Sequence, residues 1–113
     1  MNEKDCIFCK IALGEIAATI VGENELAIAF NDVSPRQPVH ILVIPKVHYA
    51  NIAELTLNDE ASLHAVMRLG SELALQHSEG SFRFSFNTGS EAGQTVFHAH
   101  GHITSRTPKA AIA

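Results

Sequence analysis

The segment from Val96 to Thr104 constrains the fold of this chain most, because histidines alternate in it with apolar or small residues. His98, His100 and His102 occupy every second position. Side chains alternate between the two faces of a β-strand, so the pattern predicts a strand with all three histidines on one face. Adjacent histidines would then lie roughly 6–7 Å apart at Cα, and the outer two roughly 13 Å apart. One metal ion binds two such neighbours more readily than three, so we expect the three histidines to differ in role.

The remaining segments predict an α+β domain with an antiparallel sheet. Four further runs have the composition or the alternation of β-strands, and they cover residues 19–22, 26–30, 39–44 and 82–86. Apolar residues at helical spacing predict a long amphipathic helix over 57–77, and a short helix is expected over 7–15. Strands first, then one long helix and a closing hairpin, are typical of this fold class.

Composition limits the classes of function. The chain has 113 residues, 46% of them hydrophobic, which predicts one domain over residues 1–113 with an ordinary core. A formal net charge of −4 argues against a general DNA- or RNA-binding protein, which would carry a basic face. The apolar runs are far shorter than the roughly 20 residues of a membrane span, so no membrane partner is expected. The first residues show no basic flank leading into a long apolar stretch, and we therefore expect no signal peptide and a cytoplasmic location.

Two cysteines, Cys6 and Cys9, are separated by two residues. In a reducing compartment such a pair is usually half of a metal site or a redox dithiol, because a structural disulfide does not persist there. A redox dithiol typically lies at a helix start just after a buried strand, whereas only a few mostly polar residues precede Cys6. A metal site is therefore the preferred prediction, and two unrelated buried thiols are the alternative.

Residues 94–104, Gln-Thr-Val-Phe-His-Ala-His-Gly-His-Ile-Thr, resemble the signature of the histidine-triad (HIT) superfamily, in which histidines alternate with apolar residues. Four more segments occur in the same order as in its nucleotide-binding branch, and they cover 6–12, 29–35, 39–48 and 87–94. The resemblance spans about residues 6–104. It implies a five-stranded antiparallel sheet with one long and one short helix, and a homodimer joined across the long helix and the neighbouring strand.

The resemblance also implies an activity. Family members hydrolyse bonds at the α-phosphate of purine nucleotides, typically phosphoramidates such as adenosine monophosphoramidate, so AMP and GMP derivatives are the expected ligands. By resemblance, His100 is the nucleophile that forms a nucleotidyl-histidine intermediate, a role that suits neutral imidazole. His102 would bind the phosphate oxygens or protonate the leaving group, and His40 would orient the other histidines. The hydroxyl of Thr95 would contact the phosphate or the leaving group.

The same resemblance assigns nucleotide-binding residues. Asp32 corresponds to a carboxylate that accepts hydrogen bonds from the ribose hydroxyls, and Asn87 to a side chain that contacts the sugar or the phosphate. The loop that follows Asn87 contains two glycines, so its backbone N–H groups, including those of Gly93 and Val96, can approach a phosphate. Four apolar residues correspond to the walls of the base pocket, with plain core packing as the alternative: Ile7, Phe8, Phe30 and Leu42.

Branches of the family that carry the cysteine pair bind structural zinc with two histidines, which correspond to His48 and His98. Two thiolates and two imidazoles make a closed tetrahedral site. The resemblance therefore implies a structural Zn²⁺ held by Cys6, Cys9, His48 and His98. This assignment would remove His98 from catalysis.

The sequence departs from the family pattern. Gly101 stands where a larger apolar residue is usual, and we expect it to weaken packing and loosen the histidine row. Residues 105–113 lack the Gly-Gly-Arg and aromatic tail that helps the phosphoramidase branch to select the leaving group. Three alternative functions therefore stay open: a dinucleoside polyphosphate hydrolase, a nucleotide-binding or interaction protein with weak catalysis, and a metal-carrier or metal-sensing module.

Overall fold

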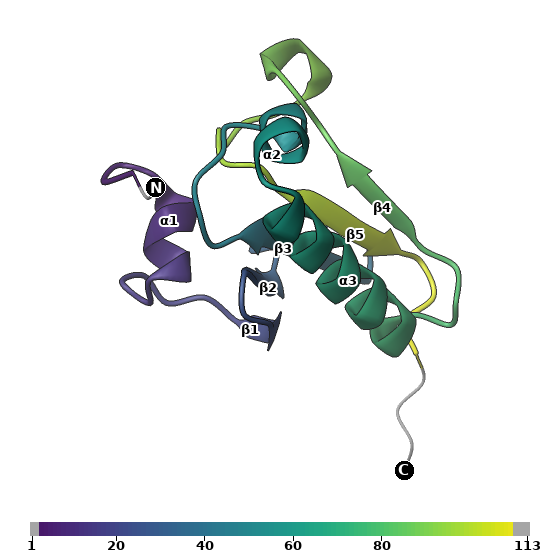
Figure 1. The fold of residues 1–113 in the computed structure, drawn as a ribbon. Helices are drawn as coiled ribbons and strands as arrows, with labels where there is room; N and C mark the ends of the chain where they lie inside the picture. The colour runs from purple at the N-terminus through teal and green to yellow at the C-terminus, as the bar shows by residue number, and fades with distance from the viewer. Residues whose placement is uncertain (1–2, 110–113) are drawn as a thin grey trace.

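The computed structural model describes residues 3–109, which form an α+β fold around a five-stranded antiparallel sheet (Figure 1). The strands are β1 (Ile20–Glu23), β2 (Ala27–Asn31), β3 (Val39–Pro45), β4 (Arg83–Phe86) and β5 (Gly101–Ser105), in the order β1-β2-β3-β5-β4. The helices are α1 (Ile7–Ala12), α2 (Ile52–Asn58) and α3 (Glu60–His77), with a 3₁₀ turn, η1, at Ser90–Ala92. The predicted fold class is confirmed.

The domain was expected to cover residues 1–113, and residues 1–2 and 110–113 lie outside the described part of the chain. The expected absence of a signal peptide concerns the first residues, which also lie partly outside it. None of the helices within residues 3–109 is long and apolar enough to span a lipid bilayer.

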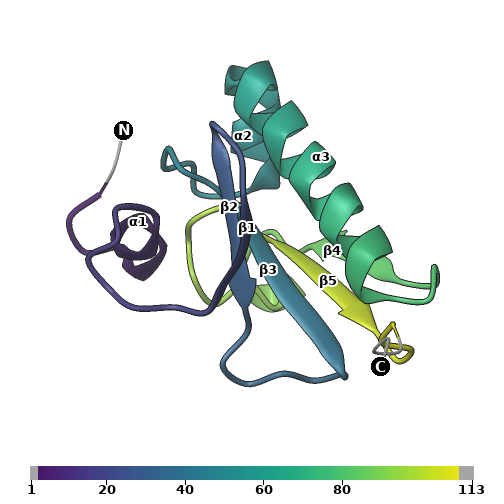
Figure 2. The same cartoon turned by 90° about the horizontal axis from the view of Figure 1, so that it is seen from below.

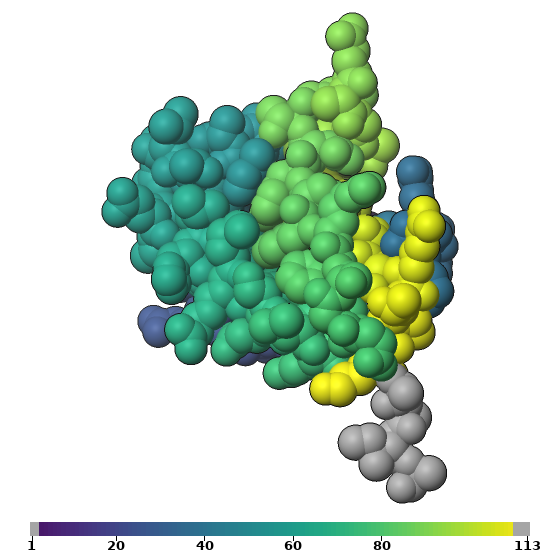
Figure 3. All heavy atoms as spheres, turned by 90° about the vertical axis from the view of Figure 1, so that its right-hand side faces the viewer, coloured from purple at the N-terminus to yellow at the C-terminus, as the bar shows by residue number. Residues whose placement is uncertain are grey.

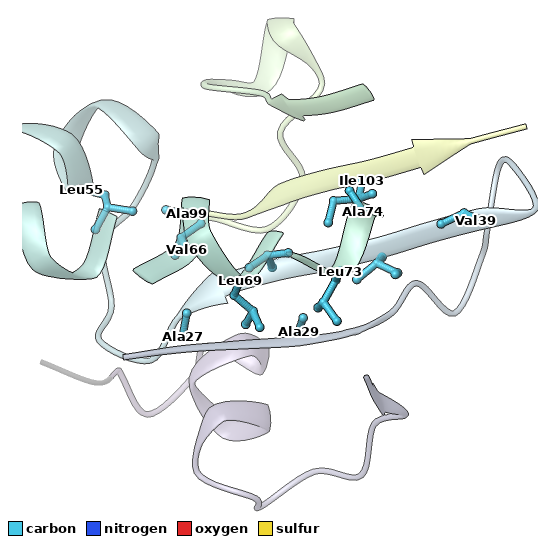
Figure 4. Close-up of a cluster of buried hydrophobic side chains, with 12 residues drawn as sticks. Ala27, Ala29, Val39, Leu55, Val66, Leu69, Leu73, Ala74, Ala99 and Ile103 are labelled. Atoms are coloured by element: carbon cyan, nitrogen blue, oxygen red, sulfur yellow. The ribbon is translucent and has the colours of Figure 1, made fainter. Parts of the chain in front are cut away.

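The two faces of the sheet differ in what covers them. α2 and α3 lie on one face (Figure 2). Three strand residues of this face, Ala29, Val39 and Ile103, share a buried cluster with Leu69 and Leu73 of α3 (Figure 4). α1 packs on the alternate residues of β2 and β3, which point to the opposite face. Farther from α1, over β3, β5 and β4, this face carries polar side chains such as His40, His102 and Ser85.

The long helix expected over 57–77 is in fact divided into α2 and α3. Asp59 has an extended backbone (φ −153°), and its carboxylate accepts a hydrogen bond from the Ser62 N–H at 3.0 Å. Asp59 therefore caps α3 instead of continuing α2. α2 buries a single residue, so it left little periodic signal in the sequence. The short helix is also shorter than the expected 7–15, because the chain turns at Gly14 with a positive φ of 77°.

The strand expected over 96–104 is also shorter than predicted, and β5 covers only its last part. The backbone before β5 bonds to groups outside the sheet. The Ala99 N–H donates to the Tyr49 carbonyl at 2.6 Å, and the His98 carbonyl accepts from the His100 ring at 2.7 Å. The alternation of side chains nevertheless holds, because Ala99 lies in the core under α3 while His98 and His100 lie against α1.

The expectation that Gly101 weakens the packing is wrong. A Cβ at Gly101 would lie 2.3 Å from Cε1 of Phe84 and 2.7 Å from Cζ of Phe86, so two rings already fill this space. A Cβ at Gly70 of α3 would lie equally close, at 2.3 Å, to the other edge of the Phe84 ring. The two glycines thus make room for one aromatic ring between β5 and α3. Phe82, expected on the same face as these rings, lies outside β4 and is exposed.

Candidate functional site

A cleft of about 520 Å³ lies on the sheet face opposite α3, over β3, β5 and β4. Predicted site residues that line it are Asp32, His40, Asn87, Gly93, Thr95, His100 and His102. Lining residues that the sequence analysis missed are Ser34, Arg36, Gln37, Arg83, Ser85, Ala92 and Thr104. A signal for Arg83 and Ser85 was present, because the phenylalanines that alternate along β4 place the intervening residues on the opposite face.

Two histidines of the cleft, His40 and His102, are joined by a hydrogen bond, and the backbone sets the proton position on His40. The Arg36 backbone N–H donates to His40 Nδ1 at 3.1 Å, so neutral His40 carries its own proton on Nε2. That Nε2 lies 3.1 Å from Nδ1 of His102 and 3.3 Å from the Asp32 carboxylate. When His102 accepts at Nδ1, its other ring nitrogen, Nε2, becomes the N–H donor.

His100 is oriented by the backbone. Its Nδ1 lies 2.7 Å from the His98 carbonyl, and a carbonyl only accepts, so Nδ1 carries the proton and Nε2 has a free lone pair. The ring is buried and packs edge-on against Phe8, with the centroids 5.1 Å apart. The ring centroid of His102 lies 4.9 Å from that of His100. A basic nitrogen and an N–H donor therefore lie side by side in the cleft.

Burial favours the neutral form of both rings. It lowers the pKa of His100, although the hydrogen bond to the His98 carbonyl and the charge of Asp32 act in the opposite direction. Burial is also the main cause that lowers the pKa of His102 to about 4, and the charges of His100 and His40 add to it. Neutral imidazoles keep the lone pair that a nucleophile or an acceptor needs.

The loop between β4 and β5 forms one wall of the cleft, and a buried glutamine that the sequence analysis did not assign holds it in place. Gln94 donates from Nε2 to the carbonyls of Ala50 at 2.7 Å and Val96 at 3.1 Å. Its Oε1 accepts from the Gly89 N–H at 2.9 Å. Gly93 has a φ of 96°, a left-handed conformation that favours glycine. These features fix the backbone that carries the predicted phosphate contacts.

The predicted metal ligands meet at the start of α1. The donor atoms of Cys6, Cys9, His48 and His98 all lie within 4.8 Å of one another. Cys9 Sγ lies 3.4 Å from His48 Nδ1 and 3.5 Å from His98 Nδ1. Cys6 Sγ lies 3.4 Å from the same nitrogen of His98. Zinc bonds of about 2.3 Å to sulfur and 2.0–2.1 Å to nitrogen place tetrahedral S and N ligands about 3.6 Å apart, so these four donors fit the ion.

The ring of His98 is prepared for a metal by its second nitrogen. Nε2 donates to the Pro45 carbonyl at 2.8 Å, which leaves Nδ1 unprotonated and directed at the sulfur atoms. Burial lowers the pKa of His98 to about 4, so the ring is neutral, as a ligand must be. Burial raises the pKa of the Cys9 thiol, and a bound cation would oppose that effect by stabilising the thiolate.

Comparison with known proteins identifies the family of this chain. A model of the HIT domain matches residues 13–109. The chain belongs to the HIT family. An uncharacterized HIT-like protein of Synechocystis is 43% identical over 106 residues, which cover 93% of each chain. A solved HIT family hydrolase from Clostridium thermocellum has a TM-score of 0.84 and 39% identity, over 91% of each chain. A hypothetical histidine triad nucleotide-binding protein from Sulfolobus tokodaii has a TM-score of 0.73 and 35% identity, over 88% of this chain and 67% of that one.

The matched HIT domain contains the cleft but only half of the metal cluster. His48 and His98 lie within the matched residues, whereas both cysteines precede them. The segment before residue 13 therefore contributes both thiols. It also adds Phe8, whose ring lies 6.0 Å from that of His98 and 5.1 Å from that of His100. α1 thus connects the metal cluster with the cleft.

The apolar residues predicted to surround the base of a nucleotide do not line the cleft. Three of them are at most 7% exposed and pack together between α1 and the sheet, and these are Phe8, Phe30 and Leu42. A role at the base pocket stays a prediction for them. The fourth, Ile7, is 47% exposed and lines a separate hollow of about 360 Å³ together with Val96. Thr95 lines both this hollow and the cleft, so the two adjoin.

Proposed function

We propose that this HIT protein is a hydrolase that cleaves nucleoside 5′-phosphoramidates or related nucleoside phosphates at the α-phosphate, through a nucleotidyl-histidine intermediate. The geometry of His100 carries the proposal, because its Nδ1–H is bound to a backbone carbonyl at 2.7 Å and its Nε2 keeps a lone pair. The C. thermocellum relative is described as a hydrolase and the S. tokodaii relative as a nucleotide-binding protein, in keeping with this activity.

In the proposed first step, His100 Nε2 attacks the α-phosphorus, and the bond from phosphorus to the leaving nitrogen or oxygen breaks. The electron pair of that bond goes to the leaving atom, which takes a proton from water. The ring becomes positively charged, and the His98 carbonyl stabilises it through the retained Nδ1–H. Meanwhile His102 Nε2–H donates to a phosphate oxygen, and His40 fixes the tautomer of His102.

In the second step, a water oxygen attacks the same phosphorus and the bond from phosphorus to His100 Nε2 breaks. Its electron pair returns to Nε2, and the proton of the water passes to solvent, so the neutral histidine is restored. Two displacements of moderate difficulty replace one that is harder.

For the nucleotide itself, we assign purine ribonucleotides such as AMP and GMP derivatives. Asp32 is half-buried at the cleft, where its carboxylate accepts from the Ser34 N–H at 2.8 Å and keeps lone pairs for the ribose hydroxyls. Asn87, Gly93 and Thr95 lie on the loop side of the cleft, and we assign them to the phosphate and the sugar.

We assign a structural Zn²⁺ to the cluster at the start of α1, held by Cys6, Cys9, His48 and His98. Four protein donors fill a tetrahedral site and leave no position for a substrate, so the ion would tie α1 to the sheet and supply no chemistry to the cleft. A site with two thiols suits a reducing, cytoplasmic location.

We also infer a homodimer. β4 is the last strand in the sheet order, so its outer edge has no strand partner within residues 3–109. Figure 3 shows β4 (green) on the surface beside α3 (teal). Met67 of α3 and Phe82, next to β4, are 39% and 38% exposed. An unpaired edge with apolar neighbours suits a second copy, and light scattering should give twice the mass of one chain.

The activity is tested by His100→Asn with adenosine monophosphoramidate as substrate. Turnover should fall by several powers of ten, as expected for loss of a nucleophile, while nucleotide binding persists. The matched control is His64→Asn on the exposed side of α3, which should turn over like wild type. Wild-type turnover in His100→Asn would refute the mechanism. Nucleotide binding without turnover in the wild-type protein would favour the interaction protein over the enzyme.

A further inference from the structure

A second hollow adjoins the cleft at the carboxyl end of β5. Its volume is about 400 Å³, and it shares Gln37, Arg83 and Thr104 with the cleft. Beyond Thr104 it continues to Arg106 and Thr107, and we call it the side groove. Phe82 also lines it, so a second copy at the β4 edge would lie beside the groove. Figure 3 views this side of the molecule, with β4 in green next to the residues after β5 in yellow. A substrate bound in the cleft can therefore extend over Thr104 into the side groove.

Strand register places Arg83 close to the catalytic histidines. Thr104 of β5 pairs with Arg83 on one side and with His40 on the other. The next pair on the same face is His102 with Ser85. Directly paired residues lie about 4.5–5.5 Å apart, and the next residue on the same face lies roughly 7 Å along the strand. The long side chain of Arg83 thus begins one residue pair away from His102 and on the same face.

The side groove is positive although the protein as a whole is negative. Arg83 and Arg106 line it, and no described carboxylate does, whereas the chain has a formal net charge of −4. Arg36 adds a third guanidinium at the cleft. None of the three arginines makes an ion pair with another residue in the part of the chain that the structure describes. Asp32, the carboxylate that lines the cleft, lies against His40 instead.

Resting on the function proposed above, we propose that the side groove holds the leaving group and selects leaving groups that carry a negative charge on a carboxylate or a phosphate. A guanidinium group binds such anions through two parallel N–H donors, one to each oxygen. An uncharged leaving group has no anionic oxygen pair to accept these two hydrogen bonds. The reaction is the one described above. The bond from phosphorus to the leaving atom breaks, its electron pair goes to that atom, and a proton from water completes the product.

The proposal is tested with two AMP phosphoramidates that differ in one charge. In one, the leaving amine is glycine with a free carboxylate, and in the other it is the neutral glycinamide. We take the ratio of kcat/KM for the glycine compound to that for the glycinamide compound, and we compare this ratio between wild type and variants. The comparison cancels the different intrinsic reactivity of the two amines.

The variants are Arg83→Gln, Arg106→Gln and the double variant, with Arg68→Gln as the matched control. Arg68 is an exposed arginine of α3 that lies 3.7 Å from Glu72 and does not line the cleft or the side groove. The ratio should fall several-fold in each single variant and about tenfold or more in the double variant. It should stay at the wild-type value in Arg68→Gln. Raised salt should lower the wild-type ratio, because the arginines are exposed.

A second arm distinguishes the source of the charge. Diadenosine triphosphate and tetraphosphate release leaving groups that carry phosphate. If the double variant loses more kcat/KM on these substrates than on the glycine compound, the groove binds a phosphate. If the double variant loses more kcat/KM on the glycine compound, the groove binds a carboxylate. A third arm measures binding of both phosphoramidates to the His100→Asn protein by calorimetry, where no turnover is needed.

The outcomes separate this proposal from the proposed function. Turnover of both phosphoramidates with an unchanged ratio in the double variant overturns the anionic groove and leaves the hydrolase in place. Absent turnover in the wild-type protein, together with tighter binding of the glycine compound, overturns the hydrolase and supports the groove. Equal affinity of the two compounds in the calorimetric arm overturns the groove.

Discussion

Replacement of Gly101 by alanine should destabilise this protein through two neighbouring rings, with the closest approach to Phe84 and a second close approach, 2.7 Å, to Cζ of Phe86. The new Cβ would lie 2.3 Å from Phe84 Cε1, whereas carbon atoms in contact lie about 3.5–4.0 Å apart. The ring would therefore have to move by more than about 1 Å. The Phe84 ring cannot move toward α3, because Gly70 of α3 lies against its other edge. A Cβ at Gly70 would lie only 2.3 Å from this ring.

The expected cost follows from general values for overpacked cores, which are about 1–3 kcal/mol. An unfolding entropy of about 2.1 cal/mol/K per residue gives a chain of 113 residues about 0.24 kcal/mol/K. The melting temperature should therefore fall by about 4–13 °C, and urea unfolding should show the same loss of free energy. Because His100 and His102 flank Gly101, we also expect slower turnover by the folded fraction.

Phe84→Leu provides the decisive comparison, since leucine lacks the ring atom that the new Cβ would approach most closely, while the contact with Phe86 remains. In the Phe84→Leu background, Gly101→Ala should cost less free energy of unfolding than it costs in the wild type, and a double-mutant cycle measures the difference. An equal cost in both backgrounds, or no cost in the wild type, would refute the reasoning.

Three further predictions concern the metal, the sugar and pH. Purified protein should contain about one zinc per chain; Cys6→Ala and Cys9→Ala should lower zinc content and Tm more than the turnover of the folded fraction, and full zinc in the double variant would exclude these ligands. Ribonucleotide substrates should exceed 2′,3′-dideoxy analogues in kcat/KM, and Asp32→Ala should erase most of that difference at constant ionic strength; equal discrimination by both proteins would remove Asp32 from the sugar site. The pKa of His102 is lowered to about 4, mainly by burial, so between that value and the ordinary value of about 6.5 this residue binds more protons in the unfolded chain, and its own contribution to the free energy of unfolding should fall by no more than about 3 kcal/mol as pH drops through this range. His102→Asn should flatten this pH dependence of urea unfolding, and an unchanged slope would contradict the assignment.

Much of the architecture could be predicted because the relevant signals are local. The β-branched run of β3 and the alternation along β4 indicate strands directly. The boundaries of the helices could be predicted less well from the sequence. Whether a residue such as Asp59 continues one helix or caps the next depends on which N–H its carboxylate meets, and the sequence offers several candidates.

The sequence by itself determined which residue types were available and which face each would occupy: a cysteine pair two residues apart, and histidines at every second position. Only the tertiary structure decided how the histidines divide their work. It places His98 Nδ1 3.4 Å from Cys6 Sγ, 92 residues away in sequence, and His102 Nδ1 3.1 Å from His40 Nε2, 62 residues away. It likewise brought Arg83 beside Thr104 through the pairing of β4 with β5. The physical reason is that spacing along a chain fixes side-chain direction, whereas proton positions and local charge depend on atoms that packing brings from distant segments.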